Sequence, residues 1–156
     1  MGTAAEQRIA LGSIVVDRSE AGARKLGDEY LGEIGRATRG LVSARATREG
    51  VELRLARRIT LFDFDSPALT AGGDRTACRF EIRGGLLVAR PGGSLTITQH
   101  TRPTNELIVA VEDYAPRLDP GLGRRGVGGF LYAQLQERAH AAVGRRYLER
   151  MTRGRS

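Results

Sequence analysis

The chain has 156 residues, and its hydrophobic content of 40% includes few aromatics and no Trp. This length suits one domain with a core of Leu, Val, Ile and Ala, so we expect a single domain over residues 1–156. The lone cysteine, Cys78, excludes an intramolecular disulfide and the Cys-rich zinc patterns, and no stretch has the apolar length of a signal peptide or membrane span. The sequence therefore predicts a cytoplasmic protein that does not enter a membrane.

Basic residues outnumber acidic ones by 25 to 18, and Lys25 is the only lysine among them. Because a guanidinium group binds phosphate or carboxylate through two parallel hydrogen bonds, an arginine-rich chain can be one that binds nucleic acid or another anion. Codon usage in a GC-rich genome produces the same excess. The spread of the arginines through the whole chain favours this second interpretation.

The N-terminal part predicts one strand and one helix. Residues 1–10 are small and polar, and we expect them to be disordered. The run Ile14–Val16 indicates a short strand, or the end of one that begins near Ile9. Ser19 is suited to cap a helix, and apolar residues at three- and four-residue spacing after it predict a helix of about sixteen residues. Internal glycines weaken this helix and leave open a break into two shorter ones.

From Leu41 to Leu118 the apolar period changes from 3.6 to 2, which predicts an antiparallel meander of six or seven strands. Gly84-Gly85 has the character of a two-residue turn inside this meander. Arg57-Arg58 indicates a bulge or a break in the second segment. The predicted strands cover residues 41–48, 51–62, 78–83, 86–90, 94–100 and 107–112.

The C-terminal part predicts a linker and a long helix. Residues 119–129 are rich in glycine and show no periodicity, which is typical of a linker. Residues 130–151 carry apolar side chains at four-residue steps from Leu131 to Met151, the pattern of an amphipathic helix. Such a helix is roughly 33 Å long and can cover one face of a sheet. The sequence thus predicts an α+β fold, a curved antiparallel sheet packed around a long C-terminal helix.

In this order of elements the chain resembles the helix-grip superfamily of START, Bet v 1 and polyketide-cyclase-like proteins. The resemblance covers nearly the whole chain as topology, and a calycin-like β-barrel with an appended helix is the alternative architecture. The helix-grip resemblance implies a cavity between the sheet and the final helix. Such a cavity binds a hydrophobic small molecule, which can be polyketide-like, a lipid or aromatic. The resemblance also suggests cyclase or dehydratase chemistry that needs no cofactor.

Three residues are candidates for such chemistry. Asp63 and Asp65 lie two apart on a predicted strand, so their carboxylates share a face and can act as acid and base. Aspartates that precede Ser66-Pro67 are also well placed to cap a turn. His100 ends a predicted strand beside a polar loop, where it can transfer protons or simply face solvent. The spacing of the histidines, Cys78 and the acidic residues predicts no metal site.

Two further groups of residues are candidates for binding. Tyrosines near the predicted helices and strand ends can line the cavity and orient a carbonyl-bearing ligand: Tyr30, Tyr114, Tyr132 and Tyr147. Outward-facing arginines on the strands predict a basic face: Arg45, Arg54, Arg79, Arg83 and Arg90. The alternative function is therefore an arginine-rich interaction module for nucleic acid or an acidic protein.

Overall fold

The computed structural model describes residues 3–11 and 14–113 of the chain. These residues form an antiparallel sheet and one helix, which confirms the α+β class. The elements are β1 (Thr3–Ala10), α1 (Glu20–Ala37), β2 (Val42–Ala46), β3 (Gly50–Leu55), β4 (Ile59–Asp65), β5 (Ala68–Thr70), β6 (Arg75–Gly84), β7 (Ser94–His100) and β8 (Glu106–Glu112).

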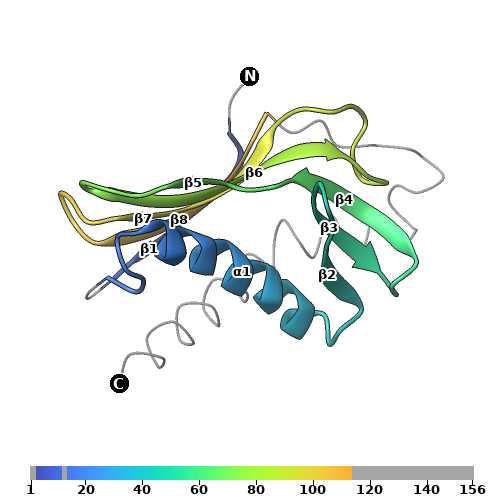
Figure 1. The fold of residues 1–156 in the computed structure, drawn as a ribbon, viewed down its shortest axis with the longest axis horizontal. Coiled ribbons are helices and arrows are strands. Elements are labelled where there is room, and N and C mark those ends of the chain that lie inside the picture. The colour runs from blue at the N-terminus through green and yellow to red at the C-terminus, as the bar shows by residue number, and fades with distance from the viewer. Residues whose placement is uncertain (1–2, 12–13, 114–156) are drawn as a thin grey trace.

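The sheet is one open, curved layer. Seven strands follow the order β1-β8-β7-β6-β4-β3-β2, and β5 pairs with β6 beside this path. Figure 1 shows the sheet bending between β6 and β4, with α1 lying along the concave side. Because β1 and β2 are the two edges of this path, the sheet is open and not the closed barrel of the alternative architecture. The helix that packs here comes before β2 to β8; the predicted helix over 130–151 and its linker lie outside the described residues.

The N-terminus differs from the prediction. Residues 3–10, expected to be disordered, form β1 and pair along their length with β8, from Thr3 opposite Glu112 to Ala10 opposite Glu106. Main-chain hydrogen bonds to a neighbouring strand require no apolar pattern, so composition did not reveal this strand. The run Ile14–Val16 is not a strand. Val15 and Val16 instead lie in an irregular segment and are buried in the core.

The predicted helix is confirmed as one unbroken helix of 18 residues. Ser19 caps it as expected, because its hydroxyl accepts a hydrogen bond of 3.1 Å from the backbone N–H of Gly22. The apolar stripe faces the sheet and is buried: Ala23, Leu26, Tyr30, Leu31 and Ile34. Tertiary contact with β6 and β2 therefore outweighs the low helix propensity of the internal glycines.

One connection in the meander follows the prediction and one differs from it. Residues 56–58 form a tight turn, so the second predicted strand breaks at Arg57-Arg58 into β3 and β4, which was one of the two expected outcomes. Residues 86–90, in contrast, do not form a partner strand for β6. The backbone N–H groups of Leu86 and Leu87 donate to Thr60 and Leu61 instead, which holds this connection against β4, and β6 pairs with β7.

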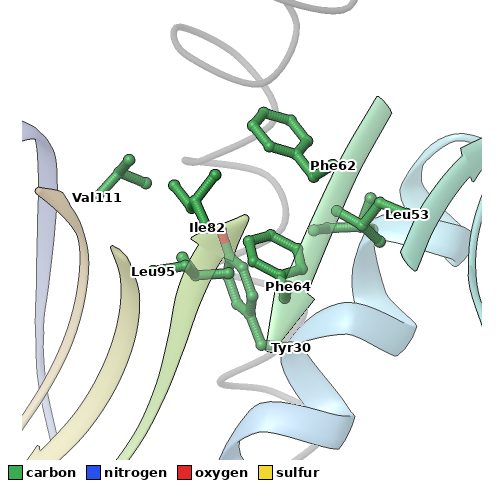
Figure 2. A pocket seen from close by; sticks show the side chains of 8 residues that line it. Tyr30, Leu53, Phe62, Phe64, Ile82, Leu95 and Val111 are labelled. Carbon is green, nitrogen blue, oxygen red and sulfur yellow. The ribbon is translucent and has the colours of Figure 1, made fainter. Parts of the chain in front are cut away.

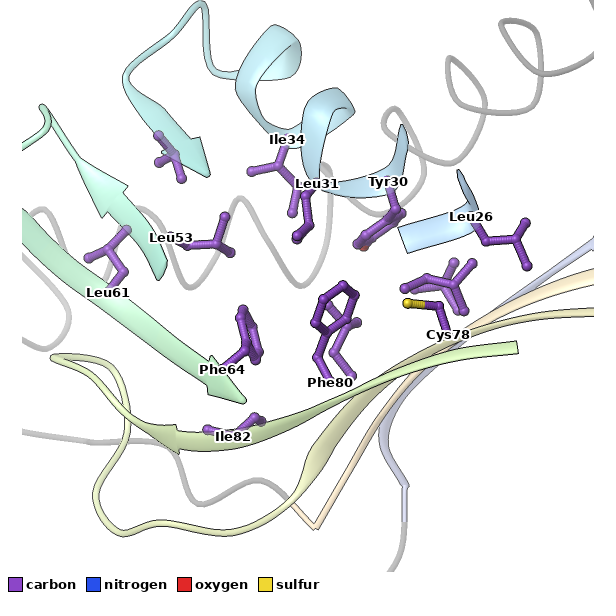
Figure 3. Close-up of a cluster of buried hydrophobic side chains, with 14 of the residues drawn as sticks. Leu26, Tyr30, Leu31, Ile34, Leu53, Leu61, Phe64, Cys78, Phe80 and Ile82 are labelled. Carbon is purple, nitrogen blue, oxygen red and sulfur yellow. The ribbon is translucent and has the colours of Figure 1, made fainter. Parts of the chain in front are cut away.

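The core lies between α1 and the concave side of the sheet (Figure 3). Cys78, Phe80 and Ile82 on β6 face the helix and alternate along the strand with the exposed Arg79 and Glu81. The ring of Phe80 lies 5.6 Å from that of Phe64 on β4, centroid to centroid. These contacts join the two halves of the bent sheet, because β4 and β6 share only a short stretch of register.

Candidate functional site

An apolar hollow opens on the concave side of the sheet, where β4 and β6 diverge. Its volume is about 70 Å³. Residues from α1 and five strands line it: Tyr30, Ile34, Leu53, Phe62, Phe64, Ile82, Leu95 and Val111. Figure 2 shows these side chains converging from helix and sheet on one space. The stacked rings of Phe62 and Phe64, 5.8 Å apart, form one wall.

The hollow forms because the sheet bends. A β-bulge interrupts the register between β3 and β4 after Leu53, and a second irregularity follows Asp63 where β4 meets β6. Bulges increase local twist and turn a strand away from its neighbour. The side chains on either side of this joint are therefore drawn apart at one end, and the space between them is left open.

Tyr30 is the one predicted tyrosine within the described residues, and it does line the hollow. Its side chain extends from α1 toward the sheet (Figure 2) and is 3% exposed. Burial raises the pKa of its phenol, so the hydroxyl keeps its proton at neutral pH and can act as a hydrogen-bond donor. Tyr114, Tyr132 and Tyr147 lie outside the described residues.

Asp63 and Asp65 share a face, as predicted, but this face is opposite to the one that Phe62 and Phe64 turn toward the hollow. Both carboxylates bind Arg83 on β6: Asp63 Oδ1 accepts from Nη2 at 2.8 Å, and Asp65 Oδ1 lies 3.3 Å from Nε. Glu49 Oε2 accepts from Nη1 at 3.0 Å. The hydrogen bond to Asp63, followed by that to Glu49, raises the pKa of Arg83. The aspartates thus belong to an ion-pair cluster around one guanidinium.

This cluster leads to a prediction about stability. Replacing Arg83 with Gln leaves three neighbouring carboxylates without their shared cation, and we expect a modest decrease in thermal stability at neutral pH. Because these side chains are partly exposed, added salt screens their repulsion and should narrow the difference from the wild type. Thermal melts at low and high salt measure both effects. Arg79→Gln is the control, because among the described residues Arg79 forms an ion pair only with Glu81. It should lower the melting temperature less than Arg83→Gln does.

His100 lies far from the two aspartates. It stands opposite Arg75 at the start of β6, whereas Asp63 stands opposite Gly84 at its end. The ten residues of β6 span about 30 Å at the usual rise of a strand. The structure therefore does not bring the three candidate catalytic residues together, and no reaction step connects them across that distance.

The predicted arginine face is largely neutralised by neighbouring carboxylates. Nε of Arg54 lies 3.7 Å from Oε2 of Glu52, and Nε of Arg79 lies 2.7 Å from Oε1 of Glu81. Arg83 forms ion pairs with the carboxylates of the cluster described above. Such pairs leave little net positive charge for a polyanion. Arg45 and Arg90 make no ion pair within the described part of the chain.

Comparison with protein-family models, with curated proteins and with solved structures finds no match to this chain. The site therefore has to be understood from its own chemistry. Within residues 3–11 and 14–113, no cluster of His, Cys, Asp and Glu has the arrangement to hold a metal ion, and no helix is long and apolar enough to cross a membrane.

Sequence reasoning missed most of the residues that line the hollow. Phe62, Leu95 and Val111 belong to three of the predicted strands, over 51–62, 94–100 and 107–112, and nothing in the sequence shows that they meet. It also missed Gln99, which is fully buried on β7 and holds the segment of Val15 and Val16 through hydrogen bonds. A polar residue on the apolar side of a strand was the one available signal. Cys78 is a core residue, and burial, with a smaller contribution from Asp28, raises the pKa of its thiol to about 12.

Proposed function

We propose that the protein binds a hydrophobic small molecule in the hollow between α1 and the bent sheet. The observation that carries the proposal is the lining itself, eight side chains of which only Tyr30 has a polar group. Ligand pockets are commonly concave and apolar with a few convergent polar groups, and this hollow has that composition. The hydroxyl of Tyr30, as the one polar group of the lining, marks the end at which a carbonyl or hydroxyl of an apolar ligand would lie.

The size of the hollow restricts which ligand it accepts. Pockets for drug-sized molecules measure about 300–1,000 Å³, whereas this one measures about 70 Å³. We therefore propose that it takes one end of a ligand, a single aromatic ring or a short aliphatic tail. The stacked Phe62 and Phe64 favour a ring, because offset aromatic contacts add to the burial of apolar area.

The lining supports binding rather than catalysis. Among the described residues no carboxylate, imidazole or thiol lines the hollow, and Tyr30 keeps its proton at neutral pH. Asp63 and Asp65 face the other side of the sheet, bound to Arg83. The helix-grip architecture, with the segment 130–151 closing the open side, remains part of this proposal. The sequential order of the sheet and its concave apolar side support it.

A thermal-shift experiment with a matched pair of variants tests the proposal. Val111→Trp places a large ring in the hollow, whereas Ile108→Trp changes a half-buried residue on the opposite face of the same strand. Small aromatic and aliphatic probes such as indole, naphthol and decanol are added to each protein. A ligand at about ten times its Kd stabilises the folded state by about 1.4 kcal/mol, or about 3–5 °C for a domain of this size.

We expect at least one probe to raise the Tm of the wild type and of Ile108→Trp, and to have no effect on Val111→Trp. Native mass spectrometry of protein purified from its own host gives an independent test. A ligand that is bound during purification increases the native mass of the protein and is released on denaturation. If no probe shifts the wild type and the native mass equals the denatured mass, the hollow is only a packing defect.

A further inference from the structure

Two connections meet at one end of the molecule and form a surface that is separate from the hollow. The link from α1 to β2 and the turn between β3 and β4 lie at the same end of the sheet (Figure 1). The backbone N–H of Ala56 donates to the carbonyl of Leu41 at 2.8 Å, which holds the two together. We call residues 39–41 and 56–59 the basic corner.

The backbone of the basic corner is held in an uncommon conformation. Arg39, Ala56 and Arg57 have φ values of 56°, 52° and 61°, so three of the four non-glycine residues with positive φ in the described chain lie here. Left-handed backbone at such residues costs free energy and persists only where neighbouring structure imposes it. Thr38 supplies part of that support, because its hydroxyl accepts from the N–H of Val42 and donates to the carbonyl of Ile34.

The basic corner also exposes apolar side chains. Leu41 is 45% exposed and Ile59 is 44% exposed, and they are the only large hydrophobic residues so exposed in the described part of the chain. Single exposed apolar side chains are ordinary in proteins, but these two belong to the two connections that meet at this end of the fold. Every residue of the corner is exposed, as expected of a surface that projects and not of one that lies in a groove.

The charge of the basic corner has no counter-charge among residues 3–11 and 14–113. Arg39, Arg57 and Arg58 are exposed and make no ion pair within the described residues, in contrast to Arg54, Arg79 and Arg83 on the sheet. No acidic residue occurs from residue 34 to 48 or from 53 to 62. The corner therefore combines two aliphatic side chains with three guanidinium groups that no described carboxylate binds.

We propose that the basic corner docks the protein on an anionic lipid surface, with Leu41 and Ile59 entering the interface and the arginines binding lipid phosphates. A projecting surface fits a planar bilayer, whereas a partner helix would require a groove. Nucleic acid would use the arginines but gain little from two aliphatic side chains, since bases stack on aromatic ones. The contact is peripheral and concerns the surface of the bilayer, not a passage across it.

Vesicle flotation of the full chain tests the proposal. Vesicles of phosphatidylcholine alone are compared with vesicles that also contain phosphatidylglycerol. Arg57→Gln/Arg58→Gln removes two cations, each of which strengthens binding to an anionic surface about fivefold, so we expect a loss of about 25-fold. Leu41→Ser/Ile59→Ser removes the apolar contact and should weaken binding about tenfold. Arg79→Gln, an exposed arginine elsewhere on the sheet, is the control, and circular dichroism checks that every variant is folded.

The proposal is supported if the wild type and Arg79→Gln bind the anionic vesicles well above the neutral ones and both double variants bind less. It is overturned if the wild type shows no preference for anionic vesicles. It is also overturned if either double variant binds as the wild type does, because the C-terminal arginines, unchanged in all variants, would then account for the binding. Loss of vesicle binding in Arg57→Gln/Arg58→Gln alone would therefore also overturn the proposal, and it would indicate a site for a soluble polyanion.

Discussion

Replacing Gln99 with Met should lower the free energy of unfolding by about 3 kcal/mol or more, since each buried polar group left without a partner costs about 1–3 kcal/mol. The Gln99 side chain is fully buried. Its Oε1 accepts from the N–H groups of Val15 and Val16 at 2.7 and 3.1 Å, and its Nε2 donates to the carbonyl of Val16 at 3.1 Å. Met preserves the volume but leaves three backbone groups unpaired. Chemical denaturation followed by circular dichroism measures the loss.

Thr76 provides the matched control for Gln99. It lies directly opposite Gln99 on β6 and is fully buried, and its hydroxyl has no hydrogen-bond partner among the described residues. Thr76→Val removes that hydroxyl at nearly constant shape, so stability should stay the same or increase. If Gln99→Met cost no more than Thr76→Val, the three hydrogen bonds would not be what holds the N-terminal segment to the sheet.

Replacing Gly27 with Ala should destabilise the protein by about 1–3 kcal/mol, the usual cost of overpacking a core. A Cβ at this position would lie 2.5 Å from Cys78 Sγ and 2.9 Å from Cζ of Phe80. Both neighbours are buried and closely packed, so neither can move without disturbing β6. The gain of about 1 kcal/mol in helix propensity does not offset this clash.

Gly32 gives the opposite expectation on the same helix. A Cβ there would approach only the guanidinium end of Arg36, at 3.3 Å, and that flexible end can shift. Gly32→Ala should therefore stabilise the protein by up to about 1 kcal/mol. The melting temperatures of Gly27→Ala and Gly32→Ala test both expectations. If both variants melted at an equally higher temperature than the wild type, α1 would not pack closely on β6 at Gly27.

The two expectations matter for the proposed site, because the same packing forms the hollow. Gly27 lets α1 approach β6, and one turn later Tyr30 reaches the hollow from that helix. A variant that moves the helix away from the sheet should alter the hollow as well. Gly27→Ala is thus expected to weaken the binding of any probe that the wild type accepts.

Local features were predictable where one segment contains its own signal. Ser19 and the apolar spacing after it specify the start and the buried face of α1, and alternation specifies the buried side of β6. Features that depend on a partner far away in the sequence were not predictable. Residues 3–10 form a strand only because β8 offers an edge, and residues 86–90 do not pair with β6 because β7 takes the place beside it.

By itself the sequence determined the α+β class, the capped helix and the order of most strands, because periodicity and capping act between residues close in the chain. The tertiary structure alone decided the candidate site. The lining residues run from Tyr30 to Val111 and come together only through strand register and the bend of the sheet. The separation of Asp63 from His100, and the meeting of Leu41 with Ala56, have the same cause. Non-local pairing leaves no periodic mark in either segment, so only the folded chain reveals it.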